Sequence, residues 1–494
     1  MHKKMPIFYS AILLTGVNLL LRFVSTSFQV FVSGRIGAAG IGLVQLVMSV
    51  GALAMTAGMA GVRTATMYLT AEELGKKRAK NVTWVLSSCF LYSILCSGVI
   101  GGALYIFAPW LATHWIGNAA TVSAIRLYAG FLPVFCLCGV MTGYFTAANR
   151  IGTLALVEVA EQFLSICVTM LLLVFWAGDE PTRAARCLIF GSGLAGCMTL
   201  LCLVVLRIKE RACCGPRIAV GKRLCSVAVP LALADDLKAG ISTTENLMVP
   251  KRLRLYAGVT EPLAAFGMVC GMVFPILMFP AAILFGLAEL LIPELARCAA
   301  AGSTQRVRYL VKRSLRVSLL YGCFFCGMEF LLAKELCMQL YKSQEAGQYL
   351  QLYALLIPML YCDAITDAMT KGLGQQKVCV RYNILTSSMD VLLLFVLLPR
   401  YGMDGYFFSF LVTHLLNFIL SLKRLLKISK CKISLSTSLL TFGACGGGIW
   451  AGSYLQTPVG KGVAFTAVFL CLLCLFGVVG KEDIYWIKGL IRKK

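Results

Sequence analysis

The chain has 494 residues, of which 59% are hydrophobic and 14% are charged. Its mean hydropathy of +0.82 excludes an ordinary soluble globular protein and indicates a polytopic membrane protein. The formal net charge of +24 is also typical of nucleic-acid-binding proteins. The distribution of the basic residues, described below, makes a nucleic-acid partner unnecessary.

Hydropathy and boundary signals predict an all-α protein with about fourteen transmembrane helices. The first span follows Lys3 and Lys4 without a small-residue cleavage site, so we expect a spanning helix and not a cleaved signal peptide. The connections are too short for a soluble catalytic domain. The predicted spans lie near residues 7–32, 40–68, 82–107, 124–147, 154–176, 187–207, 226–249, 263–292, 313–334, 349–370, 382–399, 405–424, 434–454 and 462–480.

The first predicted span carries a polar stripe. Its members recur at i, i+4, i+7 and i+11, which places them on one face of a helix. They are Asn18, Arg22, Ser25 and Gln29. Arg22 lies in the middle of the span, which favours an internal cavity, although an arginine that snorkels or forms a salt bridge near a helix end is an alternative.

Span seven has a second polar stripe, formed by Asp235, Lys238, Ser242 and Glu245, with Asp236 beside it. The spacing i, i+3, i+7, i+10 again describes one helix face. Each ionisable group at bilayer depth costs roughly 2.5–3.5 kcal/mol unless it is paired or hydrated. The stripe therefore predicts the wall of a water-accessible cavity, which is typical of transporters. The alternative is an interhelical salt-bridge ladder.

Span eight contains Pro275 and Pro280. Proline inside a helix frees a carbonyl group and bends the helix. We expect a bent helix here, which is either a moving part of the transporter or a static bend.

Acidic residues also occur at predicted cytoplasmic ends of spans. Glu72, Glu73 and Glu294 lie close in sequence to basic residues such as Lys76 and Arg297. We expect these carboxylates to form ion pairs that act as a structural latch.

A weak internal repeat relates the two halves of the chain, since Leu69–Glu72 matches Leu291–Glu294 and Tyr144–Arg150 matches Lys371–Lys377. An even number of spans in each half makes the repeat parallel, an arrangement known in transporters. We expect an N-terminal lobe at 1–215 (helices 1–6) and a C-terminal lobe at 216–430 (helices 7–12). Residues 431–494 would form two extra helices and a basic tail. The two striped helices would then face each other across a central cleft.

The loops on one side of the predicted spans carry about three times as many lysine and arginine residues as the loops on the other side. Both termini lie on the richer side, which the positive-inside rule assigns to the cytoplasm. Anionic membrane lipids are the natural partner of this excess. A smaller basic group opposes the trend, and we expect it at the outer mouth of the cavity. It comprises Arg35, Lys251, Arg252 and Arg254.

Fixed cations in a hydrated cleft attract anions, and arginine binds phosphate oxygens through a two-pronged fork. The candidate substrate-binding residues are Arg22, Arg35, Lys238, Asn18, Ser242, Arg252 and Arg254. Acidic residues leave a cation exporter open, or carry H⁺ or Na⁺ for coupling. The candidate coupling residues are Asp235, Asp236, Glu245, Glu158 and Glu161, and the candidate gating residues are Pro275 and Pro280.

No phosphate-binding glycine loop and no nucleophile–base arrangement occurs, and the chain has only 3 histidines. The 22 cysteines lie mostly in apolar segments, so they do not indicate a disulfide framework. We expect neither an enzyme nor a metal or cofactor site.

Several longer runs resemble the stage V sporulation protein B family of the multidrug/oligosaccharidyl-lipid/polysaccharide (MOP) exporter superfamily. They lie at 35–46, 240–251, 271–280, 290–295, 345–350 and 357–376, and the likeness reaches to about residue 430. The resemblance implies fourteen MATE-like transmembrane helices in the bacterial cytoplasmic membrane. It also implies a relationship to lipid II and oligosaccharide flippases and a role in spore-cortex or cell-wall peptidoglycan synthesis.

Related lipid II flippases hold the substrate pyrophosphate with arginines in a cationic cavity, and Arg22 and Arg35 lie where the resemblance implies such arginines. Lys238 stands where the family has arginine, so it keeps the charge without the fork. The resulting hypothesis is a flippase for a lipid-linked saccharide. A cation-coupled multidrug antiporter that uses Asp235 and Glu245 is one alternative, and a non-transporting scaffold for cell-wall synthesis enzymes is another.

Overall fold

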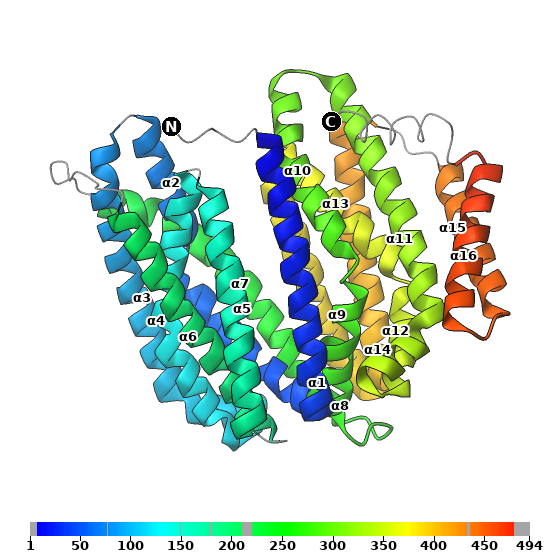
Figure 1. The fold of residues 1–494 in the computed structure, drawn as a ribbon, viewed down its shortest axis with the longest axis horizontal. Coiled ribbons are helices and arrows are strands. Elements are labelled where there is room, and N and C mark those ends of the chain that lie inside the picture. Colours follow the sequence, from blue (N-terminus) through cyan, green and yellow to red (C-terminus); the bar gives the residue numbers. More distant parts are fainter. Residues whose placement is uncertain are drawn as a thin grey trace. The chain divides into compact units, whose positions relative to one another are not determined.

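The computed structural model describes residues 7–76, 78–148, 150–177, 180–209, 220–431 and 435–478. Within these ranges the chain is helical and contains no strand (Figure 1). The helices are α1 (Ile7–Met59), α2 (Val62–Gly75), α3 (Val82–Trp110), α4 (Val122–Ala147), α5 (Ile151–Leu172), α6 (Pro181–Ile208), α7 (Gly221–Leu253), α8 (Pro262–Gly267), α9 (Phe274–Leu277), α10 (Ala281–Ala300), α11 (Thr304–Tyr341), α12 (Gln344–Ala354), α13 (Ile357–Gly372), α14 (Gln376–Ser429), α15 (Leu435–Ser453) and α16 (Pro458–Leu475). The predicted all-α fold class is confirmed.

The chain forms two compact units. Unit 1 runs to Gly271 and includes Val391–Met403, so it contains α1–α8 and a short piece of α14. Unit 2 comprises Met272–Asp390 and the chain from Asp404 onward. The lobe boundaries expected from the internal repeat, at 215/216 and 430/431, remain a prediction.

Eight helices in the described part of the chain are long and apolar enough to cross a membrane, or up to ten if each bent helix pair is one span. The chain is therefore a multi-pass membrane protein. α1 has 53 residues and would extend about 80 Å, whereas the hydrocarbon core of a bilayer is about 30 Å thick. α7 is not among the eight, although its 33 residues exceed the length of a span. The predicted number of fourteen spans remains a prediction.

Glycines interrupt the two longest helices. Gly37 in α1 has φ 69° and ψ 179°, and Gly402 in α14 has φ 58° and ψ −134°. Both conformations have positive φ, which glycine adopts without the steric cost of a Cβ atom. Each glycine therefore allows one continuous chain segment to change direction where the sequence predicted two separate spans.

The core of unit 1 lies where α2, α3 and α4 meet the start of α7. Val62, Val85, Phe145 and Leu224 are among its buried members. A Cβ atom added at Gly143 would lie 2.5 Å from the backbone oxygen of Arg63. α2 and α4 therefore pack with their backbones in close approach, as is common between membrane helices with small residues at the contact.

The proline-containing span is bent, as the sequence predicted. Segments Pro262–Leu277 and Ala281–Ala288 meet at 66°. In unit 2 the three carbonyl oxygens around this break accept hydrogen bonds from tyrosine hydroxyls of α11 and α13. The bonds are Tyr341 Oη to Met272 O (3.2 Å), Tyr361 Oη to Leu277 O (2.8 Å) and Tyr321 Oη to Pro280 O (2.7 Å). These hydroxyls tie the bent span to α11 and α13, and Pro280 O also accepts a backbone hydrogen bond from Ile283 N at 3.3 Å.

We expect Tyr361→Phe to lower the free energy of unfolding by about 1–3 kcal/mol, because it leaves a buried carbonyl group without a partner. Denaturant unfolding of the purified chain, followed by circular dichroism, measures the change. Tyr128→Phe is a matched control, since among the described residues its hydroxyl donates only to the weak acceptor Met55 Sδ at 3.7 Å. Equal destabilisation by the two substitutions would contradict the capping role.

Candidate functional site

The predicted stripe on α7 lies on an accessible face of that helix. Asp235, Lys238 and Ser242 are exposed, and Asp236 and Glu245 are half-buried. In the described part of the chain neither Asp235 nor Lys238 forms an ion pair. A salt-bridge ladder therefore does not account for these two charges.

α7 is fastened to α1 along a face that lies next to the stripe. Thr243 Oγ1 donates a hydrogen bond to the Ser49 backbone oxygen at 3.1 Å, and Asn246 Nδ2 donates to Ser49 Oγ at 3.0 Å. Thr243 is buried. Packing on α1 thus fixes the rotation of α7 about its axis, and this rotation leaves Asp235, Lys238 and Ser242 exposed.

The stripe on α1 is partly used in packing within unit 1. Ser25 Oγ accepts a hydrogen bond from Gln162 Nε2 of α5 at 3.3 Å, and Gln29 Nε2 donates to Gly271 O at 3.0 Å. Arg22 is half-buried and makes contacts. Asn18 lies in α1, but its side chain is outside the described part of the structure. The hydroxyl of Ser25 and the amide of Gln29 therefore have structural partners.

The remaining candidates are distributed over unit 1 and the bent span. Arg35 is exposed two residues before the break at Gly37, and Glu158 and Glu161 are half-buried on α5. Pro275 lies in the first turn of α9, and Pro280 directly precedes α10. The role of each in substrate binding, coupling or gating stays a prediction.

The basic group after span seven gathers around the end of α7. The guanidinium carbon of Arg252 lies 3.2 Å from the ring centroid of Phe395. Lys251 Nζ donates a hydrogen bond to the backbone oxygen of His114, and Arg254 lies beside Gly117. The pKa of Lys251 is lowered by burial and by the neighbouring charge of Arg254.

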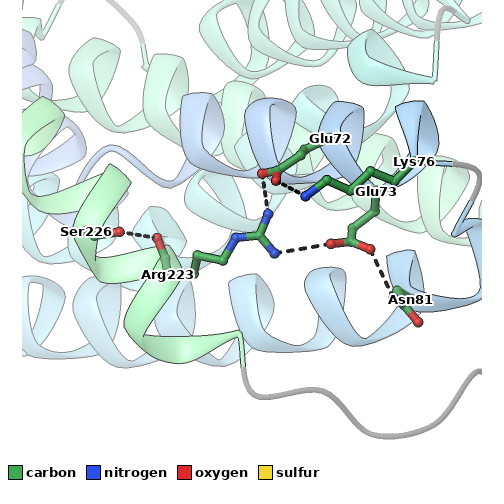
Figure 2. Close-up of polar contacts among 6 residues, drawn as sticks. All are labelled: Glu72, Glu73, Lys76, Asn81, Arg223 and Ser226. Atoms are coloured by element: carbon green, nitrogen blue, oxygen red, sulfur yellow. Dashed lines mark hydrogen bonds and ion pairs between the residues drawn. The ribbon is translucent and has the colours of Figure 1, made fainter.

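An ion-pair network joins the end of α2 to the first turn of α7 (Figure 2). Arg223 contacts Glu72, and its Nη1 lies 3.2 Å from Glu73 Oε1. Lys76 Nζ lies 2.5 Å from Glu72 Oε1, and Asn81 Nδ2 donates to Glu73 Oε2 at 3.0 Å. Hydrogen bonds to Glu72 and Glu73 raise the pKa of Arg223. The expected pairing of Glu72 with Lys76 is confirmed, whereas Arg223 was not predicted.

A similar pairing occurs in unit 2 at the residue that matches Glu72 in the internal repeat. Glu294 Oε2 lies 3.8 Å from Arg297 Nη1, and Glu294 Oε1 accepts a hydrogen bond from Arg306 Nη2 at 2.8 Å. The pair with Arg297 was expected from the sequence. Arg306, at the start of the next helix, is an additional partner.

Sequence reasoning missed three acids in unit 2, of which Asp390 and Glu329 are buried and Asp363 is half-buried. Asp390 Oδ1 accepts hydrogen bonds from Ser409 Oγ at 2.6 Å and Thr413 Oγ1 at 3.1 Å. Asp363 Oδ2 accepts from Asn417 Nδ2 at 3.1 Å, and Glu329 on α11 is 5% exposed with neither carboxyl oxygen hydrogen-bonded. All three lie inside predicted apolar spans, and that position was the available signal. No group of three or more His, Cys, Asp or Glu residues suited to a metal occurs among the described residues.

The comparisons with known proteins agree with this architecture. The MatE family model matches residues 14–171. Stage V sporulation protein B of Bacillus subtilis (strain 168) is 22% identical over 506 residues, covering 96% of each chain. The chain is therefore similar to stage V sporulation protein B along nearly its whole length. Sporulation protein YkvU of the same organism is 25% identical over 284 residues, covering 54% of this chain and 62% of that protein.

Solved structures of the MOP superfamily share the fold at low sequence identity. The lipid II flippase MurJ in an inward closed conformation has a TM-score of 0.68 at 12% identity and covers 97% of this chain and 100% of its own. An inward-facing MATE multidrug resistance transporter has a TM-score of 0.66 at 14% identity, and the match covers 84% of this chain and 98% of the transporter. A MOP transporter from Pyrococcus furiosus, described as having a binding pocket of reverse polarity, has a TM-score of 0.62 at 15% identity, covering 85% and 95%. The MATE-like and MOP-like fold expected from the sequence is confirmed.

We expect Arg223→Gln to destabilise the chain by up to about 1 kcal/mol, because it removes the cation beside buried Glu73 while solvent screens much of the interaction. A thermal unfolding scan measures the loss. The exposed Lys76, which pairs with Glu72 alone, is the control as Lys76→Gln. The difference in unfolding temperature between the two variants should become smaller at high salt. Indistinguishable unfolding temperatures at low salt would show that the contact between α2 and α7 does not stabilise the chain.

Proposed function

We propose that the chain is a membrane transporter that moves the headgroup of a polyprenyl-pyrophosphate-linked saccharide between leaflets. The observation that carries the proposal is the accessible face of α7, where Asp235 and Lys238 have no ionic partner among the described residues. Charges on a helix of a membrane protein are tolerated when they face water. We infer that this face lines a hydrated substrate path.

Phosphate chemistry supports an anionic headgroup. In this proposal Arg22 and Arg35 of α1 and Lys238 of α7 neutralise the pyrophosphate, because guanidinium and ammonium groups donate charge-assisted hydrogen bonds to its oxygens. Asn18 and Ser242 add neutral hydrogen bonds, and Arg252 and Arg254 attract the headgroup at the mouth. The fold shared with a MATE multidrug resistance transporter and the lipid II flippase MurJ supports transport as the activity.

The proposal includes a driving force and a location. Asp235, Asp236, Glu245, Glu158 and Glu161 carry H⁺ or Na⁺, and the bend at Pro275 and Pro280 allows the span to move. The chain resides in the bacterial cytoplasmic membrane with both termini in the cytoplasm. There it supplies precursor to cell-wall or spore-cortex synthesis enzymes, which are its candidate partners. Two repeated lobes, at 1–215 and 216–430, provide the scaffold.

We expect Lys238→Gln to slow flipping at least about tenfold, because it removes a cation that holds the pyrophosphate. Lys238→Arg should retain or increase the flipping rate, since arginine keeps the positive charge and can bind two phosphate oxygens at once. The measurement is leaflet exchange of a fluorescent lipid-linked precursor in proteoliposomes that contain the full chain. Lys222→Gln, an exposed position on the same helix, is the matched control.

The same assay on Arg22→Gln tests the contribution of α1, with exposed Arg308 of α11 replaced by Gln as its control. Exchange at the wild-type rate in both Arg22→Gln and Lys238→Gln would refute the anion site. If a chain lacking Arg22, Arg35 and Lys238 also rescued a deletion strain, the scaffold function would replace the transporter proposal.

A cation-coupled multidrug antiporter is the second candidate function. The observations that favour it are two carboxylates of unit 2. Buried Asp390 accepts hydrogen bonds from Ser409 and Thr413, and half-buried Asp363 accepts one from Asn417. Asp390→Asn would then abolish drug export driven by a cation gradient, because the buried anion that binds the cation is lost. Ser409→Ala keeps the charge and serves as the control.

A further inference from the structure

An apolar groove in unit 1 has the dimensions of a lipid chain. It is open, has a volume of about 570 Å³, and runs between α1 and α3. Apolar side chains alone line it, from Val50, Leu53, Ala54 and Ala57 on α1, Ile100, Ala103, Leu104, Phe107 and Trp110 on α3, and Leu111 and Trp115 beyond α3. Phe107 and Trp110 are 59% and 48% exposed, so the groove is not covered by other parts of the described chain.

The length of the groove along α3 matches the thickness of one leaflet of the hydrocarbon core. From Ile100 to Trp110, α3 rises about 15 Å, and half of a bilayer's hydrocarbon core measures about 15 Å. Trp110 and Trp115 lie together at one end of the groove, where their rings are 5.8 Å apart. Tryptophan prefers the membrane–water interface. That end therefore fits the headgroup level, and the end near Ile100 fits the bilayer midplane.

Basic residues stand at the tryptophan end. The His114 ring stacks on Trp110 with 5.5 Å between centroids, and the backbone oxygen of His114 accepts a hydrogen bond from Lys251. The guanidinium nitrogens of Arg254 lie 3.7 and 3.8 Å from where a Cβ atom on Gly117 would be. Both Lys251 and Arg254 are exposed. An apolar channel of one leaflet's depth thus ends beside two cations.

We propose that this groove binds one anionic glycerophospholipid, with an acyl chain between α1 and α3 and its phosphate against Lys251 and Arg254. Charge complementarity selects this occupant, because an acyl chain alone would need no cation. Bulk lipid could satisfy the apolar walls, but the basic pair adds a preference for negative headgroups. The site is separate from the charged stripe of α7, although it shares Arg254 with the proposed mouth of the substrate path, and phospholipid binding here does not require transport.

The tryptophans provide a direct readout. The full chain, with its four other tryptophans replaced by phenylalanine, is reconstituted in phosphatidylcholine vesicles. Phosphatidylglycerol with a brominated acyl chain, added as a minor component, should quench Trp110 and Trp115 with roughly tenfold higher apparent affinity than brominated phosphatidylcholine. Equal quenching by the two lipids would overturn the proposal.

Two sets of variants separate the headgroup from the chain. Lys251→Gln with Arg254→Gln should abolish the preference for phosphatidylglycerol, whereas Lys334→Gln with Lys342→Gln, which removes two exposed charges of unit 2, should leave it unchanged. Ala103→Leu fills the groove and should weaken quenching by both lipids. Unchanged preference in the first double variant would refute the headgroup contact.

A final arm distinguishes the phospholipid from a transport substrate. Unlabelled polyprenyl-pyrophosphate lipid is titrated against the brominated phosphatidylglycerol. Displacement only at comparable or higher mole fraction supports a phospholipid site. Displacement at a much lower fraction would assign the groove to the transported lipid and overturn the proposal.

Discussion

The structure depends on one constraint, which is that polar groups inside hydrocarbon must have partners in the protein or meet water. Helices satisfy this requirement for the backbone. At the break between α9 and α10 helical geometry fails, and Tyr361 donates a hydrogen bond to Leu277 O at the end of α9. The same requirement explains why Ser409 and Thr413 both point their hydroxyls at buried Asp390. The break and the carboxylate of Asp390 therefore lie where specific side chains of α11, α13 and the second half of α14 supply hydrogen-bond donors.

α7 shows how this constraint divides one helix into regions with different roles. Its first turn is held to α2 through Arg223 and Glu73 (Figure 2), and its middle is held to α1 through Thr243. At its end Lys251 donates a hydrogen bond to the backbone oxygen of His114, in the π-helical segment that follows α3. Between these attachments Asp235 and Lys238 are left on the accessible face. A charge without an ionic partner on a helix so well anchored is better explained by function than by structural need.

The relatives share this architecture at identities of 12–15%. At such low identity the arrangement of the helices is shared, whereas the residues that face a substrate can differ. The solved MOP structures include a lipid II flippase and multidrug transporters, so the fold alone does not select a substrate. We propose that in this chain a few side chains, chiefly Arg22, Arg35 and Lys238, make this selection.

The sequence by itself determined those features that local chemistry decides. Apolar length predicted the helices, the helical period placed Asp235 and Lys238 on one face, and proline predicted the bend before α10. The pairs Glu72–Lys76 and Glu294–Arg297 followed from spacing within a helical turn or just over one.

Tertiary structure decided the contacts between residues distant in the chain. Arg223 donates a hydrogen bond to Glu73, which lies 150 residues earlier in the chain. Gln29, a member of the predicted stripe, donates to the backbone oxygen of Gly271. The tyrosine caps and the groove beside Trp110 likewise depend on which helix faces are pressed together. Helix periodicity assigns a residue to a face, but only the packing of complete helices, driven by close fit and polar pairing, determines what that face meets.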